Sequence, residues 1–68
     1  MKLTPRELEI LRWAARGYTS KKLAAESGLK VPSVETHLRN IFRKLGVTNR
    51  GEAVSTAMKL GIITLSDL

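Results

Sequence analysis

The sequence predicts an all-α domain of four short helices. Three observations carry this prediction: apolar residues recur at helical spacing in four segments, capping residues precede three of these segments, and glycines follow the first three. The expected helices cover residues 5–16, 20–27, 32–45 and 50–60. A chain of 68 residues is near the lower end of what folds without disulfides or metals, so we expect a single domain over residues 1–68.

The first helix has a strong start signal. Thr4 is a suitable N-cap, Pro5 fits the first helical position, and Glu7 completes a capping box. Gly17 is a natural stop. Between these limits the apolar residues form one stripe, which consists of Leu8, Leu11, Ala14 and Ala15.

The second and third helices are joined by a tight turn. Thr19 can cap a helix over 20–27, in which Leu23 and Ala24 point inward, and Gly28 ends it. The run 28–30 then leads into the third helix. Two short helices joined by a glycine-containing turn form the helix-turn-helix pattern.

The fourth helix begins after Gly46 has ended the third. Asn49, with Glu52 three residues later, predicts its cap. Ala53 and Ala57 recur at a spacing that permits close helix contact. We expect Ile62 and Ile63 to dock on the core and residues 64–68 to fray.

The third helix carries two chemically different faces. At about 100° per residue, one face gathers Val34, Leu38, Ile41, Phe42 and Leu45. The other gathers Thr36, Arg39, Asn40 and Arg43, with Glu35 and Lys44 at its borders. Such a helix can bury one side and offer short polar groups and guanidinium forks to a DNA major groove. The alternative is the solvated outer face of an ordinary helical bundle.

The charge balance favours a polyanionic partner. Twelve Lys and Arg against six Asp and Glu give a formal net charge of +6 and an isoelectric point near 10.4. DNA, RNA and an anionic membrane surface all fit this excess. No apolar run approaches the length of a membrane span, and we expect no membrane partner.

Neither an enzyme nor a cofactor is indicated. The chain has no cysteine, one histidine and one aspartate, and it lacks a glycine-rich phosphate loop. His37 lies between the two faces of the third helix, where a structural role or a phosphate bond is expected, not a metal or catalytic one. Trp13 and Tyr18 are expected to pack and not to stack on bases, since neither lies on the third helix.

Three stretches resemble the LuxR-type (GerE- or NarL-type) helix-turn-helix domain of bacterial transcriptional regulators. They are LTPRELEIL at 3–11, ARGYTSK at 15–21 and VETHLRNIFRKLGVTNRGEAV at 34–54. The resemblance implies a four-helix, sequence-specific DNA-binding domain. It also implies a cytoplasmic protein, nucleoid-associated when bound, that is either the output domain of a two-component response regulator or a stand-alone regulator.

The resemblance also assigns residues to DNA bases. By position, the base-reading residues are Glu35, Thr36 and Arg39. Arg39 can make a bidentate contact with guanine, or instead clamp a phosphate. Thr36 can meet a thymine methyl or a base edge, or only set the spacing to the groove. Glu35 departs from the Lys or Arg that relatives carry; it can accept from cytosine, or pair with Arg39 four residues later.

Further roles follow from the same resemblance. Lys30 stands where relatives often have a capping serine, so we expect the third helix to start late or to be weakly capped. Glu7 and Arg50 match positions that are paired in the family, so we expect a tie between the first and fourth helices; the alternative is that each residue serves only its own helix end. The expected contacts with the DNA backbone are Thr19, Ser20, Lys21, Lys30, Ser33, Asn40, Arg43 and Lys44. A homodimer on DNA is expected to form through Val54, Met58 and Lys59 of the last helix, and RNA polymerase is a possible further partner.

Two other classes of function stay open at this point. One is a protein-interaction module whose basic face docks an acidic partner, which would be insensitive to single changes at Thr36 or Arg39. The other is non-specific binding to nucleic acid or to a membrane surface. Region 4 of sigma factors has a similar motif, but the LTPRE start and the RGEAV segment fit it less well.

Overall fold

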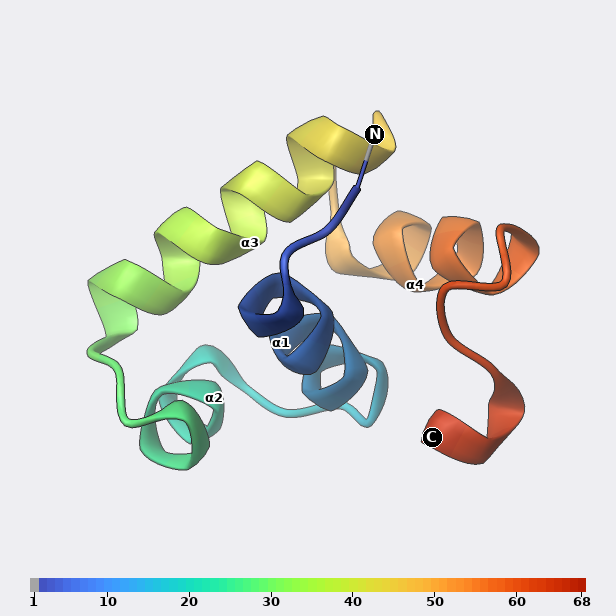
Figure 1. Ribbon diagram of the computed structural model, residues 1–68. Helices are drawn as coiled ribbons and strands as arrows, with labels where there is room; N and C mark the ends of the chain where they lie inside the picture. Colours follow the sequence, from blue (N-terminus) through green and yellow to red (C-terminus); the bar gives the residue numbers. More distant parts are fainter. Residues whose placement is uncertain (1) are drawn as a thin grey trace.

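The computed structural model describes residues 2–68, and four α-helices make up most of that part. They are α1 (Pro5–Ala15), α2 (Ser20–Ser27), α3 (Val31–Leu45) and α4 (Arg50–Lys59), followed by a short 3-10 helix, Leu65–Asp67. Helix α1 lies in the centre, with α2 and α3 on one side and α4 on the other (Figure 1). The predicted all-α fold is confirmed, and the helix limits agree to within one residue.

One small core holds the helices together. It contains the inward-facing side chains of all four helices and one residue of the tail: Ile10, Leu11, Ala14, Leu23, Ala24, Val34, Leu38, Ile41, Leu45, Ala53, Ala57 and Ile63. Burial of Ile63 confirms that the segment after α4 docks on the core. Helices α1 and α3 each contact the other three helices, so their apolar residues form the middle of the core.

The helix ends follow the predicted capping chemistry. Thr4 and Glu7 form a complete capping box, in which the Thr4 hydroxyl accepts from the Glu7 amide at 3.1 Å and the Glu7 carboxylate accepts from the Thr4 amide at 2.9 Å. Thr19 and Asn49 cap α2 and α4. Helix α3 starts at Val31, one residue earlier than expected, but Lys30 gives it no side-chain cap, so the predicted weak capping is confirmed.

The prediction that residues 64–68 fray is wrong for this structure. Leu65–Asp67 form the 3-10 helix, and the Asp67 carboxylate lies 3.5 Å from Nε of Arg12. The Asp67 carbonyl also accepts from Nε of Arg16 at 2.8 Å. The two arginines lie four residues apart on α1, so they reach the same turn of the tail. Because these contacts are made with α1, the amino acids of the tail alone did not predict them.

Within residues 2–68, no helix is both long enough and apolar enough to cross a bilayer.

The core can be tested at α2, which buries one large side chain. Leu23 is fully buried, whereas Leu60 is 61% exposed. We expect Leu23→Ala to lower the free energy of unfolding by about 2–5 kcal/mol, because it leaves a cavity. The same change at Leu60 should cost at most about 0.5 kcal/mol. Urea unfolding measures both, and equal losses would contradict this description of the core.

Candidate nucleic-acid interface

Helix α3 presents a continuous polar face to solvent. Val34, Leu38, Ile41 and Leu45 are buried, and Phe42 is half-buried against them. On the opposite side Glu35, Thr36, Arg39 and Arg43 are exposed, and Asn40 is half-buried. The expected division of this helix into a core face and a solvent face is therefore confirmed. An exposed helix of this kind has the dimensions to enter a major groove.

The three expected base-reading residues lie together on this face. The Thr36 hydroxyl donates to the carbonyl of Pro32 at 3.1 Å, so its proton is already used within the helix. Within residues 2–68 no ion pair joins Glu35 to Arg39. The suggested pairing of these two side chains is thus not formed, and the Arg39 guanidinium is not held by the carboxylate one turn earlier.

The start of α2 gathers polar groups contributed by two parts of the chain. The Thr19 hydroxyl accepts from the amide of Lys22 at 3.1 Å, and the Lys21 side chain is exposed. Arg50, from the start of α4, donates through Nη2 to the Ser20 hydroxyl at 3.0 Å and through Nη1 to the carbonyl of Tyr18. The first amides of a helix have no partner within it, so this end can offer donors and positive charge to an anion.

The expected tie between Glu7 and Arg50 is wrong for this structure. Glu7 is 4% exposed, and its carboxylate accepts from Nζ of Lys44 at 2.6 Å. The first turn of α1 lies beside the last turn of α3, which brings Lys44 and not Arg50 to the carboxylate. Arg50 instead contacts the start of α2. A position at the border of a helix face does not reveal which neighbour its side chain meets.

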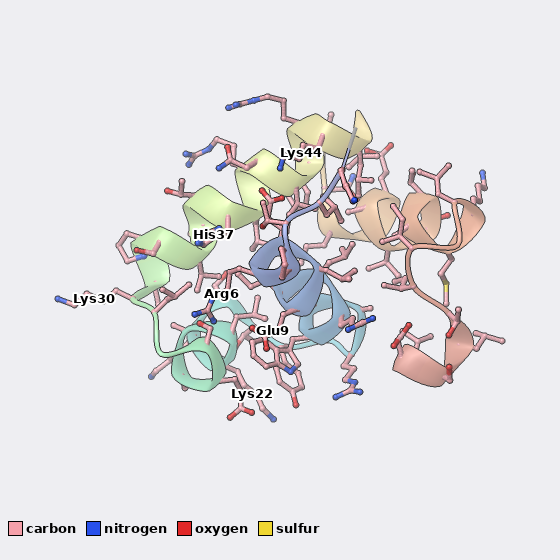
Figure 2. All side chains as sticks on the ribbon, viewed as in Figure 1. Arg6, Glu9, Lys22, Lys30, His37 and Lys44 are labelled. Atoms are coloured by element: carbon pink, nitrogen blue, oxygen red, sulfur yellow. The ribbon has the colours of Figure 1, made fainter. Side chains whose placement is uncertain are left out.

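Lys44 is consequently turned toward α1. Its Nζ also lies within hydrogen-bond distance of the Lys2 carbonyl, at 3.4 Å. In contrast, Lys30 projects away from the body of the protein at the start of α3 (Figure 2). Ser33 and Arg43 are likewise exposed, so the other expected backbone contacts on α3 lie at its surface. His37 is half-buried between the two faces.

The carboxyl of Glu7 has an altered pKa. Burial by itself raises the pKa, but the bond from Lys44 and the bonds from Thr4 together outweigh it and hold the pKa below the ordinary value of 4.5. Glu7 is therefore ionised at neutral pH. Its carboxylate accepts hydrogen bonds both from the cap of α1 and from Lys44 at the end of α3.

The aromatic side chains near α2 pack against each other. The rings of Trp13 and Tyr18 are nearly parallel, at 4°, with centroids 6.4 Å apart, and Nζ of Lys22 lies 4.4 Å from the centroid of the Tyr18 ring. The prediction that these rings pack is confirmed. The Lys22 charge is thereby drawn toward the Tyr18 ring.

Comparison with known proteins gives the family. The model of bacterial regulatory proteins of the luxR family matches residues 1–57. The chain is 44% identical, over 97% of its length, to the quorum sensing-dependent transcriptional regulator VjbR of Brucella ovis, of which it covers 26%. It is 40% identical, over 91% of its length, to the transcriptional activator RamA of Corynebacterium glutamicum, of which it covers 22%.

Two solved structures have the same fold. The response regulator ChrA of a heme-sensing two component system superposes with a TM-score of 0.89 at 38% identity, over 93% of this chain and 31% of ChrA. The transcription factor GerE superposes with a TM-score of 0.86 at 33% identity, over 93% of this chain and 94% of GerE. The chain thus spans about a quarter of VjbR but nearly all of GerE.

The order of helices and the tight turn between α2 and α3 define a helix-turn-helix domain. The chain belongs to the LuxR family of bacterial regulatory proteins. The resemblance seen in the three sequence stretches is therefore confirmed. This family consists of regulators and not of enzymes.

The Glu7–Lys44 pair predicts a pH dependence of stability. A carboxyl with a lowered folded-state pKa contributes stability above its unfolded pKa, and that stability is lost as the pH falls through the folded pKa. Glu7→Gln should cost about 1–3 kcal/mol at pH 7. The difference from wild type should shrink below pH 4.5.

Thermal unfolding between pH 7 and acid pH measures this effect. Glu9→Gln is the matched control, because Glu9 pairs with Arg6 on the surface at 3.3 Å, and such a pair contributes about 0–1 kcal/mol. Parallel pH curves for wild type and Glu7→Gln would show that the Glu7 charge does not stabilise the fold.

Proposed function

We propose that this chain binds specific sequences in double-stranded DNA to regulate transcription, with α3 in the major groove. The observation that carries the proposal is the exposed polar face of α3, in a chain of the LuxR family. Glu35, Thr36 and Arg39 contact base edges. Arg39 is the main reader, since a guanidinium fork matches the two acceptors of guanine.

The proposed DNA backbone contacts flank this reading face. They come from the start of α2 and from both ends of α3: Thr19, Ser20, Lys21, Lys30, Ser33, Asn40, Arg43 and Lys44. The exposed side chain of Lys21 and the amides at the start of α2 support a phosphate contact there. The pairing of Lys44 with Glu7 makes it the weakest member of this set, because its ammonium has to leave a buried carboxylate.

We further propose that two copies bind together. Ala53 and Ala57 of α4 are buried in the core, whereas Val54 and Met58 are half-buried and Lys59 is exposed. These last three side chains form the proposed dimer contact, with half-sites about 34–36 Å apart. RNA polymerase is a further proposed partner, in the cytoplasm of a bacterium. The match to ChrA supports a response-regulator output domain, and the match to GerE a stand-alone regulator.

The reading role of Arg39 can be tested by selection from a random duplex pool at about 150 mM salt, where non-specific attraction is partly screened. Wild type should enrich one motif. Arg39→Ala should lose the preference at one base position, with about 1–3 kcal/mol of discrimination removed. Arg43→Ala removes the same charge from the same helix and should weaken binding to all DNA sequences alike. A uniform loss for Arg39→Ala would assign Arg39 to phosphate, and no enrichment by wild type would favour a basic module for protein partners.

The backbone contacts can be tested through the salt dependence of binding. Each phosphate contact contributes about 0.9 to the slope of log affinity against log salt. Lys21→Gln should flatten the slope by about 1 for every duplex. Lys44→Gln removes an equal charge but should change the slope less, because Glu7 holds Lys44. An unchanged slope for Lys21→Gln would contradict the proposed phosphate contact at the start of α2, and an unchanged slope for both variants would contradict the proposed DNA backbone contacts as a set.

A further inference from the structure

Helix α2 packs against α3 and α1 but buries only a small part of its own surface. Of its eight residues only Leu23 and Ala24 are buried. Nevertheless α2 leads directly into the turn that starts α3, so its C-terminal end determines where the reading helix begins. The last carbonyls of a helix have no partner within the helix, and that of Ser27 needs a donor from elsewhere.

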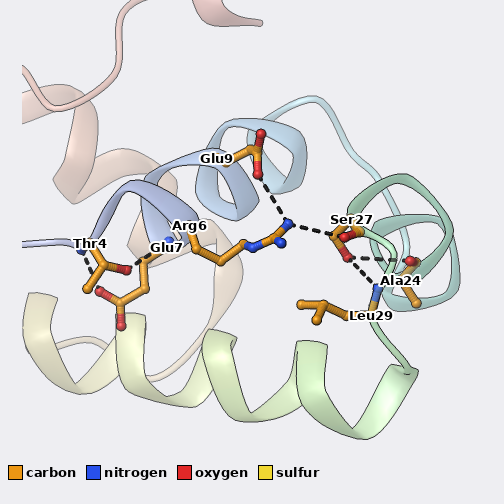
Figure 3. Close-up of polar contacts among 7 residues, drawn as sticks. All are labelled: Thr4, Arg6, Glu7, Glu9, Ala24, Ser27 and Leu29. Carbon is orange, nitrogen blue, oxygen red and sulfur yellow. Dashed lines mark hydrogen bonds and ion pairs between the residues drawn. The ribbon is translucent and has the colours of Figure 1, made fainter.

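Arg6 supplies this donor from α1. Its Nη1 donates to the Ser27 carbonyl at 3.1 Å, across 21 residues of sequence, and it also lies 3.3 Å from the Glu9 carboxylate (Figure 3). Glu9 is on the same helix, one turn later, and holds the guanidinium in this direction. A bond from a charged donor to a carbonyl is stronger than one between neutral groups.

The same residue, Ser27, organises the turn that follows. Its hydroxyl donates to the Ala24 carbonyl at 3.3 Å and accepts from the Leu29 amide at 3.3 Å. The Leu29 amide also lies 3.1 Å from the Ala24 carbonyl, and Gly28 takes the left-handed conformation, with φ of 74°. Arg6 therefore holds the residue on which the whole turn is built.

The start of α3 has no side-chain cap that would fix its position independently of this turn. Lys30 occupies the N-cap position without a side-chain bond, and Pro32 in the first turn has no amide proton. Glu35 and Thr36 lie within the first two turns of α3. Their placement thus depends on the turn, and a functional side chain has to be held within about 0.5 Å of its productive position.

We propose that Arg6 is a positioning residue for sequence reading: it holds the C-terminal end of α2 and thereby sets the entry of α3 into the groove. This inference rests on the proposed DNA-reading function. Arg6 acts through Ser27 and the turn, without itself reading a base. Its effect should therefore fall on the preference between sequences and exceed what the loss of one positive charge explains.

The test compares Arg6→Met with Arg12→Met. Both changes remove an arginine from α1, both side chains are about half exposed, and both pair with one carboxylate, but Arg12 pairs with Asp67 and makes no bond to α2. For each variant, binding to the duplex selected by wild type and to an unrelated duplex is measured at the same salt concentration. Arg6→Met should lower the ratio of the two affinities by about tenfold, the effect of losing one charge-assisted bond.

Arg12→Met should leave this ratio unchanged. Arg6→Lys keeps the charge but has a single donor nitrogen in place of the guanidinium fork, so it should lie between Arg6→Met and wild type. A second readout needs no DNA: in Arg6→Met the Leu29 amide should exchange with solvent faster than in Arg12→Met, at equal global stability. Equal ratios and equal exchange for the two methionine variants would overturn the inference. If wild type itself shows no preference between duplexes, the proposed function fails, and Leu29 exchange alone decides whether Arg6 holds the turn.

Discussion

Every other feature depends on the requirement that α3 bury one side while its opposite side stays in water. Val34, Leu38 and Ile41 place the helix firmly on the core, so the exposed residues between them have a defined direction. A helix that was apolar on every side would be completely buried, and one that was polar on every side would have no apolar face to pack on the core. The same burial that stabilises this small domain therefore also orients its candidate reading face.

The hydrophobic core is not all that joins the helices. Polar contacts between distant parts of the chain also join them. The Lys44–Glu7 pair connects α3 to α1, Arg50 connects α4 to the start of α2, and Arg6 connects α1 to the end of α2. In each case a long basic side chain reaches an acceptor on another element. Several basic side chains are thus engaged within the fold, so fewer than the twelve Lys and Arg side chains are free to contact a partner.

Local chemistry accounts for the part of the structure that the sequence predicted. Caps such as Thr4 and Asn49, and the apolar spacing of α3, depend on residues within one or two turns of each other. Other contacts depend on which elements meet in space, and no local sequence pattern encodes that. These are the Glu7–Lys44 pair, the contact of the tail with Arg12, and the bond from Arg6 to Ser27. The family resemblance supplied the candidate base-reading positions, but it also suggested the Glu7–Arg50 tie that this chain does not form.

The internal bond of Thr36 has a consequence for the order of chemical groups along a matching duplex. Because its proton is committed to the Pro32 carbonyl, the Thr36 oxygen acts only as an acceptor, as does the neighbouring Glu35 carboxylate. Arg39, one turn later, can only donate. A complementary groove would present exocyclic amino groups of cytosine or adenine toward the beginning of α3, followed by the O6 and N7 atoms of guanine. The helix surface thus carries an acceptor-to-donor polarity that would give the proposed reading of DNA a direction.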